Sequence, residues 1–73
     1  MLSDLQQAVL DVEARWWRHA GAKEAHVKAE LGLGPIRYYQ VLNALLDDPE
    51  ALAYAPVAVN RLRRLRAAGR RAA

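Results

Sequence analysis

The chain has 73 residues, no cysteine and a formal net charge of +3. A chain of this length forms one domain that buries only about 60% of the surface its unfolded form exposes, which leaves little room for a catalytic cleft. Without cysteine there is no disulfide or thiolate metal site, and two histidines alone cannot supply a structural zinc site. We expect a non-enzymatic protein that helix packing holds together, with no metal and no cofactor.

The sequence shows no sign of a membrane or export segment. No apolar run approaches the roughly 20 residues that cross a bilayer, and residues 1–4 lack the basic and apolar segments of a signal peptide. A basic amphipathic helix could lie on an anionic membrane, but Val59, Leu62 and Leu65 are too few and too small to anchor one. We therefore expect a soluble cytoplasmic protein with no membrane partner.

Charge is unevenly distributed along the chain. Residues 1–50 carry five basic and eight acidic side chains, a net charge of −3, whereas residues 51–73 carry six arginines and no acid, a net charge of +6. This asymmetry indicates a polyanionic partner, because a guanidinium matches phosphate geometry and lysine would serve solubility equally well. The alternative is a solvated tail that keeps the protein soluble.

The first predicted helix covers residues 3–20, with Ser3 as its cap and Gly21 as its end. Apolar side chains recur along it at the three- and four-residue spacing of one helix face: Leu5, Val9, Val12, Trp16 and Ala20. We expect Trp16 to pack in the core. Trp17 is rotated by about 100° from that position, so we place it at the edge.

Two further helices are predicted in the middle of the chain. One covers residues 22–31, which two glycines delimit. The other covers residues 35–46, because the missing N–H of Pro35 would be unpaired at the first position of a helix anyway. The side chains expected in the core are Ala25, Val27 and Leu31 of the first and Tyr38, Val41, Leu42 and Leu45 of the second.

The C-terminal third predicts two more helices. Residues 48–50 combine a cap, a proline and a first-turn acid, which favours a short helix over residues 49–54 and explains these acids without a catalytic role. A last helix begins at Pro56 and extends to about Arg66 or beyond. The predicted fold is therefore a compact all-α bundle of four or five helices. It forms one domain over residues 1–66, and the basic tail, residues 67–73, should fray.

Residues 23–46 have the spacing of a DNA-binding helix-turn-helix, in which a short helix braces a second helix that enters the major groove. Gly32 would supply the positive φ of the turn, and Leu33 would fill the space between the two helices. A small residue, Ala25 or Ala29, would let them approach. The alternative is an ordinary helical hairpin with a polar face.

The outward face of the helix that begins at Pro35 carries the candidate base-reading residues. Arg37 can pair with guanine, and Gln40 and Asn43 can pair with adenine. The backbone amides around Gly34 and Ile36 suit a phosphate oxygen at the positive end of the helix dipole. The complete set of candidate DNA contacts is Lys23, Lys28, Gly34, Ile36, Arg37, Tyr39, Gln40, Asn43, Arg61, Arg63, Arg64, Arg66, Arg70 and Arg71.

Five segments carry a likeness to known proteins: Glu13-Ala-Arg-Trp-Trp17, Ala20-Gly-Ala-Lys-Glu24, residues 37–46, Asp48-Pro-Glu-Ala-Leu52 and Arg61-Leu-Arg-Arg-Leu-Arg66. Through them the chain resembles a family of small actinobacterial proteins catalogued as a domain of unknown function. The resemblance implies a helix-turn-helix fold and a DNA-binding role without an assigned pathway. A looser similarity to the helix-turn-helix of sigma factors implies contact with RNA polymerase.

These observations together predict a DNA-binding protein of the nucleoid that acts as a transcription regulator or a nucleoid-associated factor on double-stranded DNA. The rival hypothesis is a protein-interaction module that binds RNA polymerase, a sigma factor or a toxin through the acidic first half and Trp17. Dimerisation through the first or the last helix stays open, because one helix-turn-helix usually reads only a half-site. His19 and His26 lie on different predicted helices with no nucleophile nearby, and we expect His19 at the end of the first helix.

Overall fold

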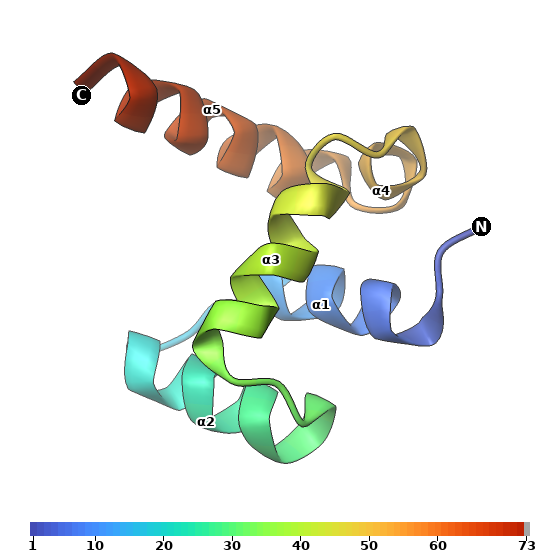
Figure 1. Ribbon diagram of the computed structural model, residues 1–73, viewed down its shortest axis with the longest axis vertical. Helices are drawn as coiled ribbons and strands as arrows, with labels where there is room; N and C mark the ends of the chain where they lie inside the picture. Colours follow the sequence, from blue (N-terminus) through green and yellow to red (C-terminus); the bar gives the residue numbers. More distant parts are fainter. Residues whose placement is uncertain (73) are drawn as a thin grey trace.

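A computed structural model describes the backbone of residues 1–72 and the side chains of residues 1–69. This part of the chain folds into five helices and contains no strand (Figure 1). Their bounds are α1 Asp4–Ala14, α2 Ala20–Leu31, α3 Pro35–Leu45, α4 Pro49–Tyr54 and α5 Pro56–Ala72. The all-α bundle is therefore confirmed. Among the described residues, no helix has both the length and the apolarity needed to cross a membrane.

Helix α1 is the centre of the fold and packs against each of the other four helices. In Figure 1 helix α3 crosses in front of it, while α2 and α5 lie at opposite ends of α3. The largest fully buried side chains come from α1, α3 and α5: Val9, Leu10, Leu45 and Val59. Because every other helix contacts α1, this short helix is the surface on which so small a chain buries its apolar side chains.

Helix α1 ends six residues earlier than predicted. The side chain of Trp17 supplies a hydrogen bond that another turn of the helix would have supplied. Its indole N–H donates to the carbonyl of Val12 at 2.8 Å, and that carbonyl would otherwise accept from the backbone of the next turn. The guanidinium of Arg15 lies 4.3 Å from the centroid of the Trp17 ring, which holds the indole in place. The predicted helix over residues 3–20 is therefore wrong at its C-terminal end.

The two tryptophans exchange the positions that the helical spacing predicted for them. Trp16 is 81% exposed in the loop after α1, whereas Trp17 is half-buried and packs against the core. The prediction that Trp16 lies in the core is wrong, because the helical period stops before that residue is reached. Leu5, also predicted on the apolar face, is 39% exposed, whereas Leu10 is completely buried.

Helix α2 begins before Gly21, with His19 as its cap. The imidazole Nδ1 of His19 accepts from the backbone N–H of Ala22 at 3.1 Å, so His19 opens the second helix and does not close the first. At the other end Gly32 has φ +68°, and its N–H donates to the carbonyl of Lys28 at 3.1 Å. The positive φ predicted for Gly32 is confirmed, and a residue with a Cβ would be strained there.

The turn between α2 and α3 has the predicted form, but the two alanines expected between these helices lie elsewhere. Leu33 is half-buried and packs against the core, and Pro35 opens the helix. Tyr38, Leu42 and Leu45 are buried, as expected. Ala25 and Ala29 are both exposed, so neither lies between α2 and α3, and their predicted place is wrong.

Helix α4 has the predicted bounds, with Asp48 accepting from the N–H of Glu50 at 2.9 Å. Helix α5 continues past Arg66 to Ala72, and its C-terminal part projects away from the other helices (Figure 1). Val59 is buried, whereas Leu65 is 62% exposed and lies outside the core. Fraying of residues 67–73 stays a prediction.

Candidate nucleic-acid interface

The outer face of α3 is exposed and carries several of the predicted DNA contacts. Ile36, Arg37, Gln40, Asn43 and Ala44 are all exposed, while the opposite face packs on α1. A rotation of 100° per residue places these five side chains within one arc of the helix. No described residue forms a hydrogen bond or ion pair with the side chain of Arg37, Gln40 or Asn43. The structure therefore brings the predicted base-reading residues together and leaves them free.

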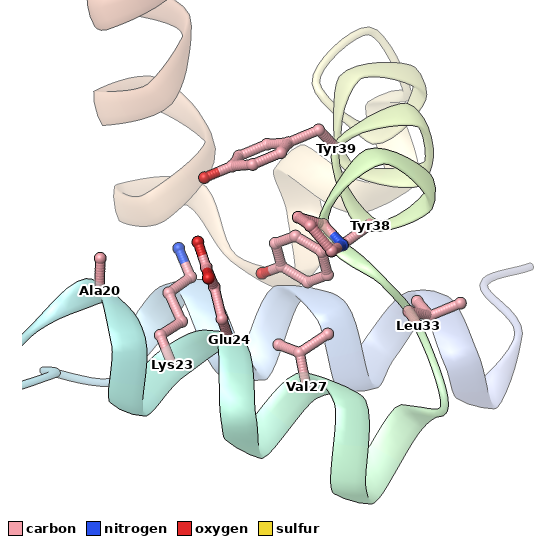
Figure 2. Close-up of a pocket in the computed structure, with 8 residues that line it drawn as sticks. Ala20, Lys23, Glu24, Val27, Leu33, Tyr38 and Tyr39 are labelled. Atoms are coloured by element: carbon pink, nitrogen blue, oxygen red, sulfur yellow. The ribbon is translucent and has the colours of Figure 1, made fainter.

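Tyr39 lies at the edge of this outer face. It is 55% exposed, and its ring meets that of Tyr38 edge-on, with centroids 5.7 Å apart and an angle of 74° between the planes. Its hydroxyl points over the space between α2 and α5 (Figure 2).

The N-terminus of α3 has no side-chain cap. Gly34 is the N-cap residue with extended backbone, and it has no side chain to accept from the first-turn N–H groups. A Cβ at this position would meet no atom within 4 Å, so a serine or threonine cap would fit. The amides of Ile36 and Arg37 are therefore not satisfied by a capping side chain.

Three of the arginines predicted to contact phosphate bind other parts of the fold. Arg61 donates to the carbonyl of Glu13 at 2.8 Å, and Arg63 donates through Nε to the carbonyl of Leu46 at 2.5 Å. Arg66 pairs with Asp47 at 2.8 Å, and this hydrogen bond raises the pKa of the guanidinium. The last two arginines thus place positive charge at the C-terminal end of α3, where the helix dipole favours it.

The remaining predicted cations differ in their surroundings. Lys28 and Arg64 are exposed, and neither has a hydrogen-bond or ion-pair partner in the described part of the chain. The side chains of Arg70 and Arg71 lie outside the described residues. A phosphate-binding role stays a prediction for all of these residues, including the arginines that have partners within the fold.

Lys23 belongs to a buried polar cluster that the sequence analysis missed. Its ammonium lies 2.5 Å from the carboxylate of Glu13, whose side chain is only 4% exposed. The hydroxyl of Tyr38 donates to the same carboxylate oxygen, and the ammonium lies 5.6 Å from the centroid of the Tyr38 ring. Figure 2 shows Lys23 extending from α2 toward Tyr38 of α3. This Glu13–Lys23–Tyr38 cluster fixes three helices relative to one another.

One signal in the sequence could have indicated Glu13. It follows Val9 by four residues and therefore lies on the apolar face of α1, where a carboxylate needs a partner. No local pattern identifies that partner, because Tyr38 is 25 positions further along the chain. Among the described residues, every buried side-chain nitrogen or oxygen has a hydrogen-bond partner.

A family model described as "Protein of unknown function (DUF3263)" matches residues 1–73. The chain belongs to this family. No curated protein and no solved structure matches it. The resemblance to a domain of unknown function is confirmed, whereas the actinobacterial source and the likeness to sigma factors stay predictions. Because the description of DUF3263 states no activity, the function must be inferred from the geometry of the site.

Tyr38 of this DUF3263 protein should resist ionisation at high pH. Burial, together with the hydrogen bond to Glu13, raises its pKa far above the ordinary value of 10.0. Because the pKa is higher in the folded state, the stability that this phenol contributes is fully present below pH 10.0. It is then lost as the pH rises toward the folded-state pKa. In an alkaline titration of tyrosinate absorbance we expect Tyr38 to ionise only as the protein unfolds.

The control for this titration is Tyr38→Phe, in which the absorbance change that coincides with unfolding should lose one tyrosine. Circular dichroism recorded on the same samples locates the unfolding step. If the folded variant and the folded parent protein show different tyrosinate absorbance below that step, Tyr38 ionises in the native state and the expectation is wrong.

Proposed function

We propose that this protein binds double-stranded DNA by placing the outer face of α3 in the major groove. The observation that carries the proposal is that Arg37, Gln40 and Asn43 share one exposed face and have no bonding partner among the described residues. These side chains supply the donors and acceptors that read guanine and adenine. Helix α2, the turn at Gly32 and helix α3 follow one another as in a helix-turn-helix, which supports the same docking.

Phosphate contacts would hold α3 in the groove. The uncapped amides of Ile36 and Arg37 lie at the positive end of the α3 dipole, which suits a phosphate oxygen. Lys28 and Arg64 are exposed cations that the fold itself does not use. The net charge of +6 over residues 51–73 also favours approach to a polyanion, even where single arginines have internal partners.

In the cell such a protein would act as a transcription regulator or as a nucleoid-associated factor. A protein that reads one half-site gains specificity by pairing, so the proposal includes a homodimer as the form that recognises a full site. Contact with RNA polymerase or a sigma factor is part of the same proposal for a regulator bound near a promoter.

A protein-interaction module is the second candidate function, and the exposure of Trp16 favours it, in place of Trp17, which is half-buried against the core. A tryptophan that is 81% exposed is a typical anchor at protein interfaces. Precipitation of partners from lysate, with and without nuclease, separates the two functions. Partners lost on nuclease treatment are bridged by DNA, and partners that stay are held by protein contact.

The test of DNA binding is fluorescence anisotropy of labelled duplexes, one of random sequence and one enriched from genomic DNA. Contacts to two phosphates, made by Lys28 and Arg64, would give a slope of about −1.8 for log K against log salt. Affinity should then fall about 12-fold between 50 and 200 mM salt. Absence of binding at the lower salt concentration contradicts the proposal.

Replacing Arg37 by alanine tests the reading face itself. If Arg37 pairs with a guanine, the variant should lose about 1–3 kcal/mol on the enriched duplex and less on the random one. The matched control is Arg18→Ala, which removes the same charge from the exposed loop between α1 and α2. Equal losses for the two variants on both duplexes would show that Arg37 contributes charge without reading sequence.

A further inference from the structure

A small cavity lies between α2 and α3, on the side of α3 that faces the protein (Figure 2). Its volume is about 100 Å³. Val27, Leu33 and Pro35 line it with apolar surface, and Ala20 lies at its far end. A cavity of about 150 Å³ with an apolar lining holds benzene, so this smaller and partly open one fits a single ring or a short branched chain.

Two tyrosines of α3 complete the cavity. Tyr38 is buried and forms part of the inner wall, while the ring of Tyr39 lies above the opening (Figure 2). Their rings meet at 74°, so together they offer aromatic surface in two orientations. Aromatic rings attract both apolar groups and cations that lie over their faces.

The charge at the opening is negative, although one lysine and one glutamate line the cavity. The ammonium of Lys23 is paired with the buried carboxylate of Glu13 at 2.5 Å, so its charge is already compensated. The carboxylate of Glu24 is exposed and has no hydrogen-bond or ion-pair partner among the described residues. A ligand held at this opening therefore meets one uncompensated negative charge.

We propose that the α2–α3 cavity binds a small organic cation, a primary amine that carries one aromatic ring or a branched aliphatic group of similar size. The apolar group fills the space between Val27, Leu33 and Tyr38, and the ammonium pairs with Glu24 beneath the ring of Tyr39. The cavity and its charge belong to the protein alone, so the inference does not rest on DNA binding. Because Pro35 and Tyr39 belong to α3, the occupant contacts the helix assigned to the major groove.

Titration with benzylamine, followed by methyl NMR spectra of the whole protein, tests this site. We expect saturable shifts at the methyl groups of Ala20, Val27 and Leu33, with a dissociation constant on the order of 1 mM. Benzyl alcohol and benzoate have the same ring with no charge and with a negative charge. Both should bind about 1.5- to 5-fold more weakly, because an exposed ion pair contributes a few tenths to one kcal/mol.

The variant Glu24→Gln should bind benzylamine no better than the parent protein binds benzyl alcohol. The matched control is Glu30→Gln, which removes the same charge from α2 at an exposed position outside the cavity and should leave the affinity unchanged. Both residues are exposed, so neither variant should unfold the protein.

Three results would overturn the inference. The first is the absence of saturable shifts at the three methyl groups. The second is equal binding of benzylamine, benzyl alcohol and benzoate, which would show that the cavity takes any ring without regard to charge. The third is an equal effect of the two glutamine variants, which would assign the preference to the net charge of the protein. Each result can be obtained without DNA, so a failure here is distinct from a failure of DNA binding.

Discussion

Replacing Lys23 by methionine is expected to lower the free energy of unfolding by about 2–3 kcal/mol, a large part of the stability of so small a protein. Methionine keeps most of the aliphatic length of lysine but leaves the carboxylate of Glu13 with only the hydroxyl of Tyr38. The side chain of Glu13 is 4% exposed, so water cannot replace the missing cation. We place the value below the usual cost of breaking a fully buried pair because the Lys23 side chain is 23% exposed.

Urea unfolding followed by circular dichroism measures this loss. The matched control is Lys28→Met, on the same helix but exposed and without a partner in the described part of the chain; it should change the free energy by less than about 0.5 kcal/mol. Combining Lys23→Met with Glu13→Gln removes the unpaired charge and should recover part of the loss. If the double variant is less stable than Lys23→Met alone, the lost stability does not come from the buried charge.

Replacing Leu10 by alanine should destabilise the protein still more, by about 3–5 kcal/mol. Leu10 is completely buried in α1, the helix that contacts all others, so the cavity left behind cannot be filled by a single neighbour. For a chain of this size each kcal/mol lowers the melting temperature by roughly 4–8 °C. The melting temperature of the variant should therefore fall by roughly 12–40 °C relative to the parent protein.

The comparison for Leu10→Ala is Leu65→Ala in α5. Leu65 is 62% exposed, and the same truncation there should change the free energy of unfolding by less than about 0.5 kcal/mol. The two variants make the same truncation at a buried and at an exposed position, so the pair tests the burial that the structure gives. Similar losses for the two variants would contradict it.

Helices α3 and α4 could be predicted almost to the residue because their boundaries are set by local chemistry. Pro35 is the first residue of α3 and Pro49 is the first residue of α4. The side chain of Asp48 caps α4 by accepting from the backbone N–H of Glu50, two residues further along the chain. The end of α1 could not be predicted in this way. No glycine or proline lies between Ala14 and His19, and the break depends on a hydrogen bond from Trp17 back to Val12 that apolar periodicity does not reveal.

Both faces of α3 could be predicted, because the helical period of 3.6 residues determines which side chains point toward the core and which point to solvent. The fate of the arginines was not. Arg63 bonds to a carbonyl 17 residues away and Arg61 to one 48 residues away, and such pairings depend on how the helices meet. Composition alone made each arginine equally available to a phosphate, whereas the fold leaves Arg64 without a partner among the described residues.

The central position of α1 also determines when this protein can fold during its synthesis. Helix α1 is synthesised before the other four helices, yet Arg61, whose guanidinium bonds to the carbonyl of Glu13, lies 48 residues later. Until α5 has emerged, the nascent chain lacks one of the helices that pack on α1. Folding of the bundle is therefore completed only after α5 has been made. Chains stopped before α5 should be targets for chaperones and proteases.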